Sequence, residues 1–324
     1  MPFFESVFGH YLSQAVAYSV VAVAFIEVML AVWRVREPLL QMKFRLIALA
    51  LPVLCPLVYY LLSPFRGGLA LLDVNRWLEL RLAEGITLGH VFGVMLLGTA
   101  VYCLGKEAFP AVRYYLGRRA VLPAIAPGRF PRLDAARAAL SRGQVNVPRI
   151  LLSPEKAPLA YVTGGALVIS AALLDLLDDD ELQAVISHEV AHSSRSVVRL
   201  SRLLLALRWL LFYNPVAILI FHRMVSDREK LCDDLAIRLS GKRLSLTSGL
   251  LKLFRHVHED SPVGGGPRRL RWRPGTQEDT ARRGLVRERV QRITRADPGS
   301  ATPYPGLQLA VAGILLAGLL FFVV

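Results

Sequence analysis

Residues 186–192 read Ile-Ser-His-Glu-Val-Ala-His, and this stretch contains the pattern H-E-x-x-H inside a segment that is predicted to be helical. Residues four apart lie on one face of a helix, so the imidazoles of His188 and His192 can reach a single metal ion. Glu189 can hold a metal-bound water and accept its proton, which is the general-base role in zinc peptidases. The competing interpretation is an ordinary amphipathic helix with two satisfied histidines, and the rest of the chain must decide between them.

A catalytic zinc site needs a third protein ligand and an open position for water. The extended pattern H-E-x-x-H-x-x-G-x-x-H is excluded, because its Gly and last His positions hold Arg195 and Val198. The next long predicted helix, 215–240, carries an acidic cluster in which Glu229 and Asp233 share a face. We therefore expect Glu229 to bind the metal and Asp233 to orient a ligand from outside. Taken alone, the cluster would be better interpreted as a solvated helix face.

The composition of the chain is too apolar for an ordinary soluble protein. Hydrophobic residues make up 54% of the 324 residues, and the mean hydropathy is +0.43. Membrane spans are therefore expected, and basic segments beside them explain the net charge of +14 better than nucleic-acid binding does. The three cysteines imply no disulfide framework. Four apolar runs approach the roughly 20 residues that cross a bilayer: 11–33, 46–64, 86–104 and 305–324.

Lysines and arginines beside these runs predict the topology. They are enriched in 34–45 and after residue 105, so both regions are predicted to be cytoplasmic, with the N-terminus and the 65–85 loop outside. The predicted architecture is α+β and mostly helical. Three spans precede a cytoplasmic, gluzincin-like H-E-x-x-H domain with a small β-sheet at 106–304, and a fourth span at 305–324 follows it.

The segment 199–221 is apolar, but whether it enters the membrane is left open. Arg202 and Arg208 interrupt it and Pro215 breaks it. A full crossing would move Glu229 to the opposite side from the two histidines. We therefore expect a buried helical pair that dips into the bilayer at most.

Short-range signals predict the elements around the H-E-x-x-H helix. The acids at 178–181 suit the start of that helix, because they can cap it and complement its dipole. The edge of a small sheet could hold an extended peptide, although a purely structural hairpin is equally expected. The elements predicted before the helix are a short helix at 133–141, a strand at 149–153, and strands at 159–163 and 166–170 around Gly164-Gly165.

Three further features are weaker candidates. Arg289, in a predicted helix at 287–293, could stabilise an oxyanion, but a salt-bridged helix is the better interpretation. His222 precedes Glu229 by two helical turns and could line the cleft, although a core role is more common. The basic run 268–273 is expected to face solvent or lipid headgroups, and it is also a candidate self-cleavage site.

Three motifs together resemble the membrane zinc peptidases of the BlaR/MecR sensor-transducer type. They are His-Glu-Val-Ala-His at 188–192, Phe-Tyr-Asn-Pro at 212–215 and Asp-Arg-Glu-Lys-Leu-Cys-Asp at 227–233. The related HtpX and CaaX-prenyl-protease families share H-E-x-x-H and a later E-x-x-A-D. Cys232, in the place of that alanine, favours the sensor-transducer type.

The resemblance implies one Zn²⁺ per chain on His188, His192 and Glu229, with Glu189 as the catalytic base. It also implies regulated proteolysis of a cytoplasmic or juxtamembrane protein, often a transcriptional repressor, at a bacterial-type inner membrane with the active site on the cytoplasmic side. The expected partners are this protein substrate and the lipid bilayer, without direct nucleic-acid binding, and a homodimer is left open. The antibiotic sensors carry an extracellular penicillin-binding domain after the fourth span. This sequence stops at Val324, so its signal is expected through the spans, the outer loop or a partner.

Two alternatives stay open at this point. The first is a quality-control protease of the HtpX kind, which shares the chemistry but acts on many membrane proteins. The second is a signalling scaffold that binds zinc without catalysis, and Glu189 argues against it because a structural site has no use for a base. The substrate, the activating signal and the occurrence of self-cleavage do not follow from the sequence.

Overall fold

The computed structural model of the chain clusters into two compact units, and each is described by itself. The first comprises Met1–Val112, Leu203–Asp227 and Gly299–Val324, and the second comprises Arg113–Arg202 and Arg228–Pro298. The residues that the structure describes are 7–62, 77–105, 130–142, 147–153, 155, 157–163, 165–259, 279–295 and 303–323. The basic run 268–273 and Gly164 lie outside them.

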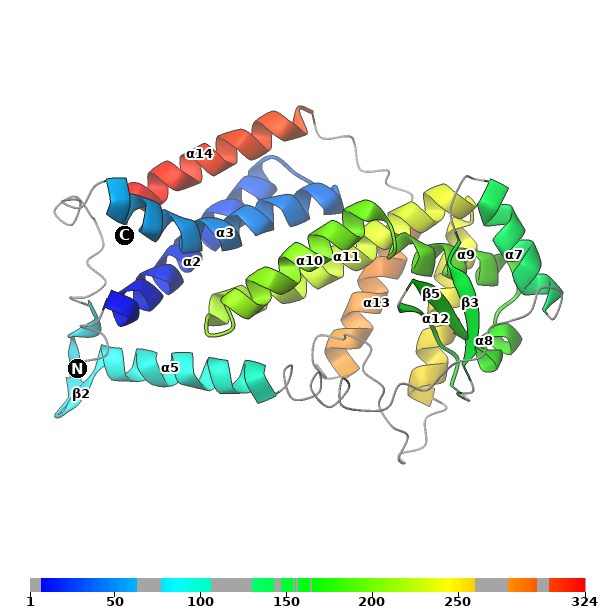
Figure 1. The fold of residues 1–324 in the computed structure, drawn as a ribbon, viewed down its shortest axis with the longest axis horizontal. Coiled ribbons are helices and arrows are strands. Elements are labelled where there is room, and N and C mark those ends of the chain that lie inside the picture. The colour runs from blue at the N-terminus through cyan, green and yellow to red at the C-terminus, as the bar shows by residue number, and fades with distance from the viewer. Residues whose placement is uncertain are drawn as a thin grey trace. The chain divides into compact units, whose positions relative to one another are not determined.

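The first unit is built on long apolar helices, which are blue and red in Figure 1. Among the described residues, three helices are long and apolar enough to cross a membrane, through Tyr11–Val32, Pro38–Val58 and Pro305–Phe322. Their shared core includes Tyr18, Phe44 and Leu316, which are completely buried. The helices are α2 (Val7–Val32), α3 (Pro38–Leu62) and α14 (Pro305–Val323), and a shorter apolar helix, α5 (Leu88–Cys103), follows the hairpin of β1 (Arg81–Ala83) and β2 (Ile86–Thr87).

Two predicted span boundaries differ from the structure. Helix α3 begins at Pro38 rather than at 46, with Pro at the first helical position that it favours. Arg45, which was assigned to a cytoplasmic loop, is therefore helical and buried. In the predicted third span, residues 86 and 87 are a strand, and α5 begins after Thr87, whose N–H donates to His90 Nδ1 at 3.1 Å. The four-span topology and the domain limits stay predictions.

The second unit contains the predicted sheet. Its strand order is β3-β5-β4, with β3 parallel and β4 antiparallel to β5. The turn between β4 and β5 includes Gly165 at φ +76°, in the left-handed region that favours glycine. The strands agree with the predicted ones to within a residue, so the mostly helical α+β class with a small sheet is confirmed. They are β3 (Arg149–Ser153), β4 (Ala160–Thr163) and β5 (Ala166–Ser170).

The H-E-x-x-H segment lies on helix α9 (Asp179–Ala191), at the centre of this unit. Asp178 caps the helix, and its carboxylate accepts from Glu181 N–H while Glu181 accepts from Asp178 N–H. Leu182 and Ile186 lie fully buried in a core with the sheet and with α7 (Pro131–Arg142). The remaining helices are α8 (Ala171–Leu176), α10 (Arg195–Leu210), α11 (Pro215–Ser240), α12 (Arg243–Glu259) and α13 (Asp279–Thr294).

Helix α11 has the start and end that were predicted. Asn214 caps it, because the Asn214 side-chain oxygen accepts from the N–H groups of Val216 and Ala217. The helix ends at Ser240, before Gly241 at φ +70°. One uninterrupted helix therefore carries both residues 215–227 and the acidic cluster that contains Glu229 and Asp233.

Candidate metal centre

Three predicted ligands come together in the second unit. His188 Nε2 lies 3.5 Å and His192 Nε2 lies 3.9 Å from Glu229 Oε2. One ligand atom from each residue falls within 4.8 Å of the others. Two ligands at the roughly 2.0–2.1 Å bond lengths of a tetrahedral zinc would lie about 3.4 Å apart, close to the two distances from Glu229 Oε2.

The two histidines owe their positions to α9. His188 is in its last turn and His192 is the residue that closes it, with φ −60° and ψ −24°, so the helical spacing is kept through the motif. Their rings meet edge to face, with centroids 5.0 Å apart. Glu229 comes from α11 and lies 37 residues after His192 in the sequence.

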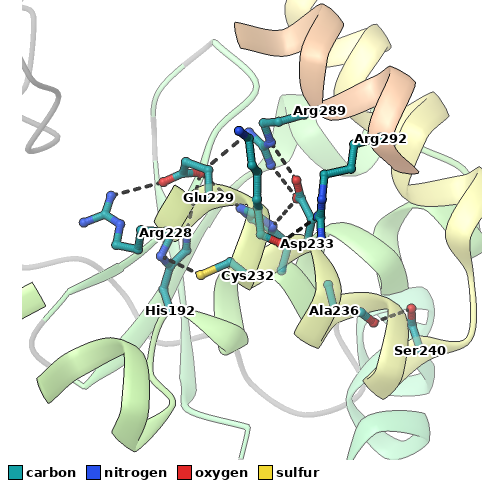
Figure 2. A network of polar contacts seen from close by, with 11 residues as sticks. His192, Arg228, Glu229, Cys232, Asp233, Ala236, Ser240, Arg289 and Arg292 are labelled. Atoms are coloured by element: carbon teal, nitrogen blue, oxygen red, sulfur yellow. Dashed lines mark hydrogen bonds and ion pairs between the residues drawn. The ribbon is translucent and has the colours of Figure 1, made fainter. Parts of the chain in front are cut away.

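One oxygen of Glu229 faces the histidines and the other is held by a neighbour. Arg228 Nη2 donates to Glu229 Oε1 at 3.1 Å, as Figure 2 shows. Oε2 is then the oxygen directed at the two imidazoles. Sequence reasoning missed this role of Arg228, although the adjacent basic residue in the motif was a usable signal.

A second layer of side chains contacts the backs of both imidazoles. Asp233 Oδ1 lies 3.0 Å from His188 Nδ1, at a distance of close contact although the ring N–H is not well aligned with it. Cys232 Sγ lies 3.3 Å from His192 Nδ1. With Nδ1 occupied in this way, each ring presents Nε2 toward Glu229, and outer contacts of this kind orient histidine ligands in metal sites. The role of Asp233 was expected, whereas that of Cys232 was not.

Arg289 of α13 completes this layer. Its guanidinium makes two parallel hydrogen bonds to Asp233, with Nε to Oδ2 at 2.8 Å and Nη2 to Oδ1 at 2.6 Å. Its Nη1 lies 3.6 Å from Glu229 Oε2. Arg289 is thus salt-bridged to a different helix, and Figure 2 shows the guanidinium directed at Asp233. The alternative of an oxyanion donor stays a prediction.

The electrostatics of the group keep its acids ionised. Burial alone would raise the pKa of Glu229, but His188, Arg289 and His192 outweigh it and hold the pKa well below the usual range. Burial also opposes ionisation of Asp233, whose pKa is nevertheless lowered, mainly by Arg289. Glu229 is therefore an ionised oxygen donor beside two imidazoles, which is a form in which it can bind a metal ion.

His188 and Cys232 are shifted in the opposite direction. Burial tends to lower the pKa of His188, but Asp233 and Glu229 raise it to about 9 in the metal-free chain. Burial and the nearby acids raise the pKa of Cys232 well above its ordinary value. Cys232 is therefore a thiol that contacts His192, and the donor set that fits a metal is two nitrogens and one oxygen. This set is typical of catalytic rather than structural zinc sites.

The two remaining predicted site residues are placed as follows. Glu189 is buried in α9, directly after His188 and 5% exposed, on the element that also carries both histidines. His222 belongs to the part of α11 that groups with the membrane helices, whereas the three ligands belong to the second unit. The roles of Glu189 as base and of His222 in substrate binding stay predictions.

Comparison with known proteins identifies similar families. Residues 161–268 match the family model described as BlaR1 peptidase M56. A protease HtpX homolog 1 of Sulfolobus acidocaldarius is 31% identical over 121 residues, which cover 34% of this chain and 38% of the relative. A protease HtpX homolog of Pelotomaculum thermopropionicum is 27% identical over 168 residues, covering 40% and 59% respectively. One from Thermococcus kodakarensis is 24% identical over 226 residues, covering 54% and 78%.

The chain thus spans less than two thirds of the length of the first two of these relatives. The matched family region contains the H-E-x-x-H helix and the acidic cluster, which together form the His–His–Glu group. With the candidate membrane helices, these similarities support a membrane metallopeptidase of the BlaR1 and HtpX type.

Proposed function

We propose that this chain is a zinc-dependent endopeptidase of a bacterial-type inner membrane, with its active site on the cytoplasmic side. The observation that carries the proposal is the approach of His188, His192 and Glu229 to within 4.8 Å at their ligand atoms. Glu189 adds a carboxylate on the same helix, at the position where a zinc peptidase has its general base. This residue distinguishes the proposal from a non-catalytic zinc scaffold.

Each step of the proposed peptide hydrolysis is assigned to a small number of residues. A zinc ion bound at this site supplies a Lewis acid that acidifies water and polarises a peptide carbonyl. The carboxylate of Glu189 accepts the proton of the attacking water and delivers it to the leaving amine. Asp233 and Cys232 keep both imidazoles in the orientation that ligation requires.

The edge of the sheet is the proposed binding place for an extended substrate. Strand β4 is an outer strand in the order β3-β5-β4, and it packs against α9. An outer strand can pair with an extended peptide through backbone hydrogen bonds, and a peptide bound there would lie beside the helix of the two histidines. Flexible cytoplasmic or juxtamembrane segments are the substrates that can adopt this conformation.

Two substrate classes are consistent with this chemistry. The first is a single regulated target, such as a transcriptional repressor, in line with the match to the BlaR1 peptidase family. The second is a broad set of damaged membrane proteins, in line with the HtpX homologues. Comparative proteomics of cells with the wild type and with the Glu189→Gln variant separates them. One stabilised protein favours the first class, and many unrelated membrane proteins favour the second.

The test of catalysis uses the purified full chain in detergent, with zinc content and peptide cleavage measured on the same sample. We expect Glu189→Gln to retain one zinc per chain and to lose about 10²–10⁴-fold in cleavage rate. His192→Ala should lose both zinc and activity. Glu288→Gln, at a side chain that is 55% exposed, is the control and should match the wild type. A Glu189→Gln variant that cleaves at the wild-type rate would refute the proposal.

A further inference from the structure

The segment Leu203–Asp227 groups with the membrane helices rather than with the H-E-x-x-H unit. It contains the second half of α10, a turn and the first half of α11. Figure 1 shows the two helices doubling back, and Arg208 lies over the ring of Phe221 at 5.1 Å, which joins them. We infer that this segment is a re-entrant hairpin that enters the bilayer to about half its depth and returns on the side it came from.

The depth of the turn is set by one hydrogen bond. Asn214 Nδ2 donates to Ser19 Oγ at 2.8 Å, and both residues are completely buried. The candidate span of α2 is Tyr11–Val32, so Ser19 lies eight residues from one end and thirteen from the other. At about 1.5 Å per residue, Ser19 is roughly 4 Å from the centre of the span. The turn therefore reaches the middle of the membrane.

A second contact gives the direction of α11. Arg223 Nη1 lies 3.0 Å from Glu27 Oε1. Glu27 follows Ser19 by eight residues, and Arg223 follows Asn214 by nine. Both helices thus advance by about 12–14 Å between the two contacts, so the first half of α11 runs alongside α2 in the same direction.

The residues at the Glu27 level form a charged layer, defined here as Glu27, Arg45, Arg223 and Asp227. Arg45 donates to both oxygens of Glu27, at 2.9 and 3.3 Å, and also pairs with Asp227. Arg45 and Asp227 are 8% and 2% exposed. Two guanidinium groups balance two carboxylates, which lowers the cost of holding charge inside an apolar phase. Glu27 lies roughly 8 Å from the centre of the Tyr11–Val32 span, on the other side of that centre from Ser19, so α11 passes this layer on its way out of the bilayer core.

The depth of the turn excludes a complete crossing. Seen from the Glu27 side, the turn at Ser19 lies only roughly 4 Å beyond the centre of the span, whereas each half of the roughly 30 Å hydrocarbon core is about 15 Å thick. Asn214 in the turn meets the requirement for backbone inside lipid, because its polar groups are bonded internally. Asn214 N–H donates to Leu211 C=O at 2.9 Å, and the Asn214 side chain caps α11.

The outer surface of the hairpin fits acyl chains. Five of its large apolar side chains are exposed, while Arg208 is 7% exposed and lies 3.8 Å from Cys103 Sγ, inside the protein. Because the segment groups with the candidate spans, lipid is the occupant that we infer for this apolar surface. The exposed side chains are Leu203, Leu205, Trp209, Leu210 and Leu219, at 40–65%. Since Glu229 follows in the same helix, the hairpin anchors in the bilayer the helix that carries the third predicted ligand.

Cysteine labelling of the full chain in sealed membrane vesicles of both orientations tests this inference. The three native cysteines are buried, and the unsubstituted chain gives their background. Leu210→Cys and Leu219→Cys report on the hairpin. Ile314→Cys is the control for a lipid-facing span, and Leu244→Cys is the control for a site outside the spans; both positions are 72% exposed.

We expect Leu244→Cys to react with a membrane-impermeant maleimide from one side only. Leu210→Cys should react from neither side, at less than about a tenth of that rate, as Ile314→Cys does. After labelling with a permeant fluorophore, the fluorescence of Leu210→Cys should be quenched more strongly by nitroxides deep in the acyl chains than by shallow ones. The depth preference of Leu219→Cys should lie between those of Leu210→Cys and Leu244→Cys. Zinc content checks folding of each variant.

Either of two results would overturn the hairpin. Reaction of Leu210→Cys from the side opposite to Leu244→Cys would show that the segment crosses the bilayer. Reaction at the Leu244→Cys rate from the same side, without deep quenching, would show that it lies outside the membrane.

Discussion

The contact between Arg289 and Asp233 allows a sharp prediction about stability. Asp233 is fully buried, and Arg289 provides it with two charge-assisted hydrogen bonds. The substitution Arg289→Gln removes the positive charge and leaves a carboxylate inside the protein. Breaking a buried pair from one side costs about 3–5 kcal/mol, because the remaining charge is uncompensated.

The expected loss lies near the lower end of that range. Asp233 keeps its contact with His188, which can bear a proton and so replaces part of the lost charge. We therefore expect Arg289→Gln to lower the free energy of unfolding by about 3 kcal/mol. For a domain of 150–250 residues this corresponds to a fall in Tm of roughly 6–12 °C.

The assay is a thermal melt of the metal-free full chain in detergent, followed by near-UV circular dichroism. The matched control is Arg292→Gln on the same helix, because Arg292 pairs with Asp234 while both side chains stay more than a quarter exposed. A partly exposed pair of this kind contributes only about 0–1 kcal/mol. The control should therefore melt within about 2–4 °C of the wild type.

A double variant separates stability from metal binding. Replacing both partners, in Arg289→Met with Asp233→Leu, removes the unpaired charge and should recover at least half of the lost Tm. Zinc affinity should stay about 10–100-fold weaker, because His188 has lost its outer contact. The reasoning is refuted if Arg289→Gln melts with the control, or if the double variant melts below the single one.

Four further predictions concern the same molecule. Because the pKa of metal-free His188 is raised to about 9, a metal ion must displace a proton from it in order to bind. The apparent zinc affinity, measured by chelator competition, should therefore rise about tenfold per pH unit between pH 6.5 and 8.5. An affinity that does not change with pH would contradict this. The same shift should stabilise the metal-free fold below pH 6.5, with the contribution lost as the pH rises through 9, as pH-dependent melts can show. Cys232→Ala should weaken zinc binding about tenfold without lowering Tm by more than a few degrees. An unchanged zinc affinity would show that the contact between Cys232 and His192 does not contribute to metal binding. Arg45→Met should lower the Tm of the full chain, since it leaves Asp227 without its buried partner, and a wild-type melt would show that the pair adds no stability.

Much of the local structure followed from the sequence because its causes are short-range. The capping of α9 by Asp178, the strands around Gly165 and the limits of α11 each depend on residues within a few positions of one another. The spacing of His188 and His192 is likewise a property of one helical turn. The two histidines of the candidate site were therefore evident before any tertiary information.

The third ligand required a distant element, and only the fold shows Glu229 Oε2 beside both imidazoles. The side chains around the three ligands were even harder to predict from the sequence. Arg289 reaches Asp233 from a helix 56 residues away, and the contact of Cys232 with His192 depends on the packing of α11 on α9. No local pattern encodes such contacts, because their geometry results from packing between elements.

Charge in the membrane region gives the clearest contrast. From the sequence, Arg45 indicates a solvated loop, since an isolated guanidinium is costly to bury. Tertiary structure brings Glu27 and Asp227 to it and cancels that cost, so α3 continues through the residue. The sequence by itself thus determined the local elements and the metal-binding motif. Only the tertiary structure decided which charges are paired, and therefore which of them can be buried.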